Sequence, residues 1–147
     1  MQDFFPALAA NHVFKVAFWA WAIAQLLKFP VNILMYGKLD LKRLIGSGGM
    51  PSSHSALVMS LAVSVGKHQG WDSPIFAVAA VTAGIVMYDA AGVRRAAGRQ
   101  AEVLNQIIDE LYQGSHISPG RLKELIGHTP FEVLMGGILG AFLGFFL

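Results

Sequence analysis

The chain contains no cysteine and few charged residues. Without cysteine it can form neither a disulfide nor a thiolate metal site. Charged residues make up 14% of its 147 residues, and hydrophobic residues make up 54%, whereas an average soluble domain has about 25% charged residues. This composition argues against an ordinary soluble domain and indicates an integral membrane protein. We expect membrane lipids as partners and no nucleic acid.

The start of the chain lacks the basic residues that begin a cleaved signal peptide. Its first twelve residues include Asp3 but no Lys or Arg, whereas a signal peptide places basic residues before its apolar run. We therefore expect every apolar segment to remain in the mature protein. The length fits one domain, so residues 1–147 are predicted to form a single membrane domain.

Four apolar stretches approach the length of about 20 residues that crosses a bilayer. The second is the least certain span because polar residues at 67–69 interrupt its last turn. It is either a short or tilted span or a helix buried in the bundle. In the first stretch, Pro30 predicts a kink or an end near Phe29. The predicted fold is an all-α integral membrane protein with about four transmembrane helices, at residues 13–35, 55–71, 74–91 and 131–147.

The fourth stretch carries Gly136, Gly140 and Gly144 at four-residue spacing. Such a face of small residues lets another helix approach closely. The neighbouring helix can belong to a second copy or to the same chain, and we favour a homodimer.

The basic residues lie in two connections between the apolar stretches. These connections hold eight of the eleven Lys and Arg residues, and cytoplasmic loops are enriched in both types. With four spans, both termini lie outside and the two basic loops in the cytoplasm, in a membrane that we expect to be the bacterial inner (plasma) membrane. In residues 98–113 the apolar residues recur with helical spacing and polar residues lie between them. This pattern predicts an amphipathic helix at the cytoplasmic interface or against the bundle.

This topology brings three polar segments to one face of the membrane. Residues 46–56, GSGGMPSSHSA, enter the second stretch there. Residues 87–99, MYDAAGVRRAAGR, leave the third, and residues 127–133, GHTPFEV, enter the fourth. Each segment has two interpretations. The glycines and serines can cap a helix or cradle a phosphate at its positive end, and Arg94 and Arg95 can anchor a span end or bind phosphate.

Two acidic residues help to define the chemistry of this face. Asp89 lies within the third apolar stretch, inside the predicted membrane region, where a carboxylate is costly and generally paired. It therefore indicates a polar interior but no particular reaction. Glu132 stands four residues after His128, on the same helix face. A carboxylate there would fix the imidazole tautomer and leave the other nitrogen free as a base or nucleophile; the alternative is a solvated pair at a helix start. The paired-histidine zinc spacing is missing, so we expect no metal.

These motifs resemble a known family. Residues 51–54, Pro-Ser-Ser-His, resemble the Pro-Ser-Gly-His motif of the type 2 phosphatidic acid phosphatase superfamily, which includes vanadium haloperoxidases. The longer strings GGMPSSHSA, YDAAGVRRAAGRQA and GHTPFEV more closely resemble its divergent branch of small bacterial and plastid membrane proteins. That resemblance covers most of the chain.

The resemblance implies a histidine phosphatase that works without metal or cofactor and that vanadate, a phosphate mimic, inhibits. His128 would attack phosphorus, Glu132 would orient it in place of the usual aspartate, and His54 would protonate the leaving oxygen. A phosphohistidine divides one hard displacement into two. The predicted phosphate-binding residues are Ser52, Ser53, Gly49, Arg94, Arg95, Lys28 and Arg121, with Asp89 in support.

The sequence departs from the classical enzymes in both basic motifs. No lysine stands seven residues before an Arg-Pro pair, and Lys28 and Lys38 compete for that role. Arg121 lies seven rather than six residues before His128, so Arg94 and Arg95 compete with it. Two functions therefore follow: a phosphatase acting on a lipid phosphate at the cytoplasmic face, or a non-catalytic membrane protein that binds phospholipid head groups or protein partners in the same pocket.

Overall fold

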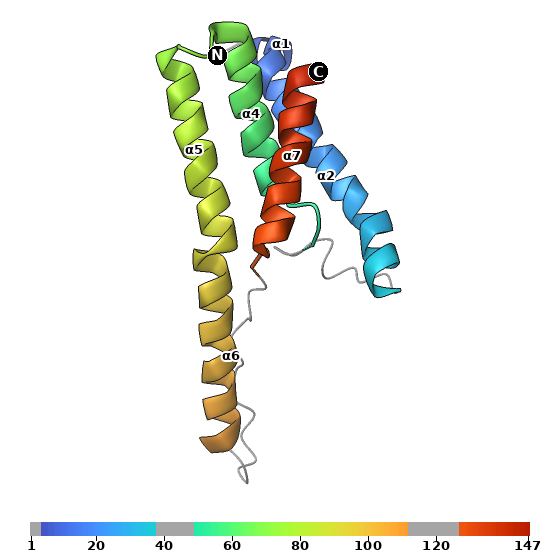
Figure 1. The fold of residues 1–147 in the computed structure, drawn as a ribbon, viewed down its shortest axis with the longest axis vertical. Coiled ribbons are helices and arrows are strands. Elements are labelled where there is room, and N and C mark those ends of the chain that lie inside the picture. The colour runs from blue at the N-terminus through green and yellow to red at the C-terminus, as the bar shows by residue number, and fades with distance from the viewer. Residues whose placement is uncertain (1–3, 38–48, 112–126) are drawn as a thin grey trace.

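The computed structural model describes residues 4–37, 49–111 and 127–147, and these form helices without any strand (Figure 1). The helices are α1 (Phe4–Ala10), α2 (His12–Tyr36), α4 (Ser53–Gln69), α5 (Pro74–Ala91), α6 (Val93–Leu111) and α7 (Pro130–Phe146). The predicted all-α class is confirmed for this part of the chain.

Polar capping residues set the starts of the four long helices that form the bundle. In each case a side-chain oxygen accepts a hydrogen bond from the backbone N–H three residues later; the capping residues are Asn11, Ser52, Ser73 and Thr129. Such a bond satisfies one of the N–H groups that a helix start leaves free. The apolar stretches therefore begin as helices at positions that the local sequence defines.

Of the two outcomes predicted at Pro30, a kink or an end near Phe29, the end is wrong. Helix α2 contains Pro30 and continues to Tyr36, where Gly37 adopts a left-handed conformation with φ 65°. Proline removes one backbone hydrogen bond from a helix, but residues beyond it still pack: Asn32 is buried inside the bundle. Glycine adopts a positive φ without strain, so the helix ends there instead.

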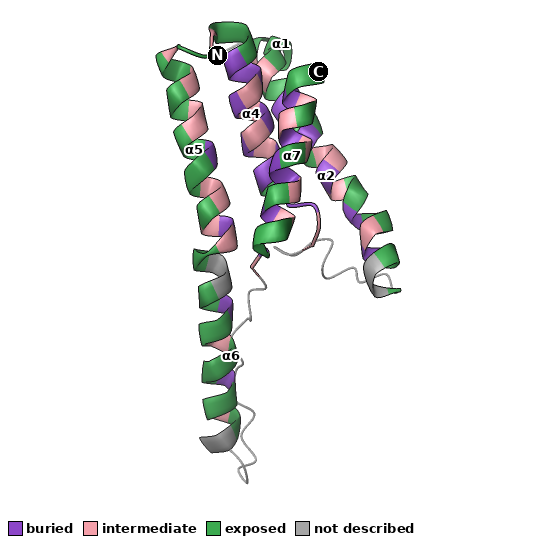
Figure 2. Ribbon diagram, viewed as in Figure 1, coloured by how far each residue is buried: buried purple, intermediate pink, exposed green. Residues whose placement is uncertain are grey.

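Helix α4 lies at the centre of the bundle and contacts α2, α5 and α7. It runs in the same direction as α7, while α2 and α5 run in the opposite direction (Figure 1). Much of its surface is buried (Figure 2). The second stretch therefore forms a helix that is buried among its neighbours, and its 17 residues are also compatible with a short span. Helix α6 extends from α5 beyond the bundle and, among the described helices, contacts only α5; it contains the predicted amphipathic segment as far as Leu111.

The glycine face of α7 packs against α4 of the same chain. A Cβ atom at Gly136 would overlap the backbone of Ser52, and one at Gly140 would overlap the backbone carbonyl of Ala56. Gly144 lies in the same way against Ser60. Both helices therefore present small residues at four-residue spacing, and their backbones approach closely. The neighbour that the glycines require is α4, so the glycine face gives no support to a homodimer.

Two helices of the described chain are long and apolar enough to cross a membrane, one within residues 12–34 and one that begins at Pro74. Helices α4 and α7 are shorter, with 17 residues each. Large apolar side chains are exposed on the outer surfaces of the bundle, including Leu34 on α2, Ile85 on α5 and Ile138 on α7. Exposure on this scale is unusual for a soluble monomer and marks a surface that contacts lipid or protein.

Candidate functional site

The starts of α4 and α7 lie at the same end of the bundle as the ends of α2 and α5 (Figure 1). We call it the polar end. The backbone N–H of Ser52, just before α4, donates a hydrogen bond to the carbonyl oxygen of Glu132 in the first turn of α7 (3.1 Å). Because α4 and α7 are parallel, the positive ends of two helix dipoles lie side by side there, an arrangement that favours an anion.

The glycine-serine segment forms the cap of α4. Gly49 has φ 94°, a conformation that favours glycine, before the cis peptide bond between Met50 and Pro51. Ser52 is completely buried, and its Oγ accepts hydrogen bonds from the backbone N–H (3.4 Å) and the hydroxyl (3.0 Å) of Ser55. Ser53, also buried, is the first residue of α4. The capping interpretation of this segment is therefore correct for Ser52.

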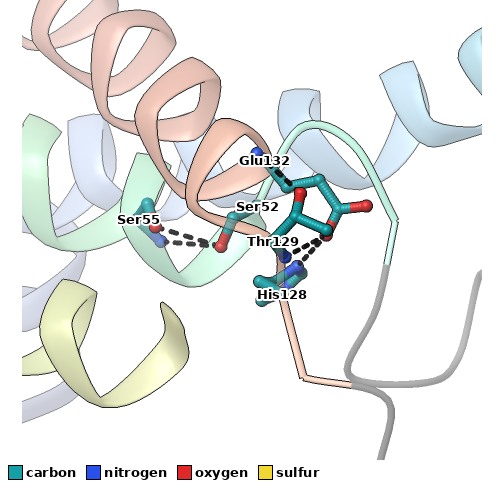
Figure 3. A network of polar contacts seen from close by, with 5 residues as sticks. All are labelled: Ser52, Ser55, His128, Thr129 and Glu132. Atoms are coloured by element: carbon teal, nitrogen blue, oxygen red, sulfur yellow. Dashed lines mark hydrogen bonds and ion pairs between the residues drawn. The ribbon is translucent and has the colours of Figure 1, made fainter. Parts of the chain in front are cut away.

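His128 and Glu132 form the predicted pair at the start of α7 (Figure 3). The Nδ1 atom of His128 lies 3.2 Å from the Oε2 atom of Glu132, and the same oxygen accepts a hydrogen bond from the backbone N–H of Thr129 (3.0 Å). The imidazole is buried, with 2% of its surface exposed, and Glu132 is 15% exposed. The Glu132 carboxylate thus fixes the Nδ1 side of the buried imidazole.

The other ring nitrogen of His128 is buried and has no hydrogen-bond partner in the described structure. Burying such a group without a partner is costly. The ring of His54, in the first turn of α4, lies near it, with 6.4 Å between the ring centroids. Because His54 is exposed, it can exchange protons with water while facing the buried imidazole. The two rings therefore meet edge to face, one buried and one exposed.

Helix α2 contributes a buried cation to the polar end. Lys28 is only 3% exposed, and its helix contacts both α4 and α7. Gln25 and Asn32 lie on the same face, three residues before and four residues after it, and Asn32 is buried. Lys28 was predicted from the sequence, whereas Gln25 and Asn32 were not, although polar residues at helical spacing in an apolar stretch were the available signal.

The structure places the remaining predicted site residues in less detail than His128, Glu132 and Lys28. Asp89 is half-buried near the end of α5. Arg94 and Arg95 lie in the first turn of α6, but their side chains are outside the described structure, as are Lys38 and Arg121. Within the described residues, no three His, Asp or Glu side chains are grouped as a metal ion would need.

Fold and site together define an all-helical membrane protein with a histidine–carboxylate pair and a buried lysine at one end of its bundle. Residues 9–143 match the model of the Divergent PAP2 family, and the chain belongs to that family. A similar protein is "Uncharacterized membrane protein YuiD" of Bacillus subtilis (strain 168), which is 41% identical over 131 residues, covering 82% of this chain and 83% of the relative. No solved structure matches the chain.

Proposed function

We propose that the protein is a metal-independent phosphatase of lipid phosphates that forms a phosphohistidine on His128. The observation that carries the proposal is the state of the His128 ring: Glu132 holds Nδ1, while the buried Nε2 has no hydrogen-bond partner in the described structure. A histidine held in this way presents the lone pair of its free nitrogen as a nucleophile.

The proposed reaction has two displacements at phosphorus. The Nε2 atom of His128 forms a bond to phosphorus as the bond to the lipid oxygen breaks, and protonated His54 gives its proton to that oxygen. Water then attacks the phosphohistidine, His54 accepts a proton from it, and phosphate leaves with the imidazole restored. Glu132 stabilises the positive charge that the ring carries in the intermediate.

Binding of the phosphate is supported by the charges around the pair. Lys28 supplies a buried cation, and the starts of α4 and α7 supply backbone N–H groups and helix dipoles. Positive groups stabilise charge on the equatorial oxygens of a transferring phosphoryl group. Arg94, Arg95, Arg121, Gly49 and Ser53 remain proposed as further phosphate ligands, with Asp89 in support, and vanadate is expected to inhibit. Ser52 can contribute only through a hydroxyl that already caps α4.

Replacing Lys28 with methionine should lower kcat/KM about a hundredfold, because removing one donor aimed at developing charge typically costs that much. Methionine keeps the length of the side chain and suits an apolar helix, so the thermal midpoint should not fall. Lys15→Met, on the exposed face of the same helix, is the control and should leave activity unchanged. A wild-type kcat/KM in Lys28→Met would exclude Lys28 as a phosphate ligand. It would favour Arg94, Arg95 or Arg121 in that role.

We further propose four spans, with both termini outside and the polar end in the cytoplasm of a bacterial inner membrane. The alternating directions of α2, α4, α5 and α7 support this topology, and 17 residues make a helix of about 26 Å, close to the bilayer core of about 30 Å.

The absence of native cysteine makes this topology directly testable. A cysteine at Arg99 should be protected in intact cells from a membrane-impermeant maleimide and should react after lysis. A cysteine at Gln69, at the opposite end of the bundle, should react in intact cells. The reverse pattern would place the site outside.

Phosphate release tests the function itself. Purified protein in detergent with excess chelator should release phosphate from phosphatidate, phosphatidylglycerophosphate or a polyprenyl phosphate. Saturable binding of these lipids without any turnover would instead favour a non-catalytic protein that binds phospholipid head groups. Activity that chelators abolish would exclude the metal-independent mechanism.

A further inference from the structure

The first turn of α7 uses one carboxylate for two purposes. Glu132 belongs to a capping box: the side chain of Thr129 accepts a hydrogen bond from the backbone N–H of Glu132 (3.3 Å), and the Glu132 carboxylate accepts one from the N–H of Thr129 (3.0 Å). A capping box satisfies two free N–H groups at a helix start in this reciprocal way. The oxygen that completes the box, Oε2, is also the oxygen that faces Nδ1 of His128.

We infer that Thr129 is a positioning residue for His128, acting through Glu132. A glutamate side chain has three rotatable bonds and, at the edge of a site, would sample several rotamers. In the capping box, the Thr129 hydroxyl fixes the backbone N–H of Glu132, and the Thr129 backbone N–H fixes the Glu132 carboxylate. The carboxylate is thereby held against the imidazole, and the imidazole tautomer that leaves Nε2 unprotonated is favoured.

A second contact fixes the same turn from outside α7. The carbonyl oxygen of Glu132 accepts the hydrogen bond from the N–H of Ser52 (3.1 Å), and Ser52 caps α4 in turn. The position of the carboxylate is therefore set by both helix starts. Thr129 itself is exposed, so its hydroxyl can be removed without opening a cavity in the bundle.

The tautomer of His128 can be measured without reference to activity. In protein labelled with nitrogen-15 on histidine, the shifts of the two ring nitrogens report which one carries the proton. The wild type should favour the form protonated at Nδ1. Thr129→Val removes the hydroxyl and keeps the shape, and it should shift the tautomer ratio toward the Nε2-protonated form about fivefold, the factor that corresponds to the loss of one helix cap.

Three further variants separate positioning from folding. Thr129→Ser keeps the accepting oxygen and should restore the wild-type ratio. Thr129→Gly removes the hydroxyl at little cost to helix stability, since glycine is tolerated at this position, and should shift the ratio in the same direction by a smaller factor. Thr82→Val, which removes a hydroxyl that bonds the carbonyl of Val78 in the middle of α5, is the matched control and should leave His128 unchanged.

The activity arm of this inference rests on the proposed phosphatase function. If the protein is a phosphatase, Thr129→Val should lower kcat about fivefold, and Thr129→Gly by a smaller factor, with little change in KM. A group that acts only on the nucleophile changes kcat rather than substrate binding. If neither the wild type nor any variant turns over lipid phosphate, but the tautomer ratio still shifts in the variants, the phosphatase function fails and the positioning role stands. A wild-type tautomer ratio in both Thr129→Val and Thr129→Gly would overturn the positioning role.

Discussion

Replacing His128 with alanine is expected to abolish phosphate release, lowering kcat at least about ten-thousandfold, the scale on which loss of a catalytic nucleophile acts. In the proposed reaction no other side chain can take its place, since His128 alone presents a buried, unpartnered ring nitrogen among the described residues. Release of phosphate from each active lipid substrate, followed with a phosphate dye, measures the loss.

The controls for this experiment are histidines at the opposite end of the bundle. His12 and His68 lie together there, with 4.8 Å between their ring centroids, and both are exposed. Alanine at either position should leave kcat unchanged. Binding of the substrate lipid should persist in His128→Ala, because Lys28 and the two helix starts remain. Substantial turnover by His128→Ala would exclude the histidine mechanism.

The second large effect concerns stability. Gly140→Ala should lower the free energy of unfolding by about 1–3 kcal/mol, the usual cost of overpacking. The new Cβ atom would overlap the carbonyl of Ala56, which is helix backbone and cannot rotate away. The two helices would have to separate along their whole contact, and the site at their starts would open with them.

Gly84→Ala is the matched control, because nothing lies within 4 Å of a Cβ atom at that position in α5. Alanine favours a helix by up to about 1 kcal/mol over glycine, so this variant should be as stable as the wild type or more stable. Thermal unfolding in detergent, followed by circular dichroism, compares the two. An unchanged midpoint in Gly140→Ala would mean that α4 and α7 do not pack as described.

The positions of the helices were largely predictable because their signals are local. The stretch predicted at 74–91 coincides with α5, whose start is set by Ser73 and Pro74. The stretch predicted at 13–35 likewise coincides with α2, although the helix does not end near Phe29, because packing beyond a proline depends on residues distant in the sequence. The partner of the glycine face was not predictable for the same reason, since spacing shows that a helix must approach but not which one.

The site was predictable in outline but not in detail. The spacing of His128 and Glu132 is local and predicted their contact, but His128 lies just before α7 rather than on a face of the helix. The burial of Lys28 depends on how α2 packs against α4 and α7, which the local sequence does not determine. The second use of Glu132, in the capping box with Thr129, was also missed, although a threonine followed three residues later by glutamate is its known signature.

Trapping the intermediate tests the central claim most directly. Protein mixed with a phosphorus-32-labelled lipid phosphate, quenched rapidly and kept alkaline to preserve phosphohistidine, should carry label on the peptide that contains His128. Glu132→Ala should carry less label, and His128→Ala none. Label on another residue, or active turnover with no labelled protein at any time point, would contradict the account.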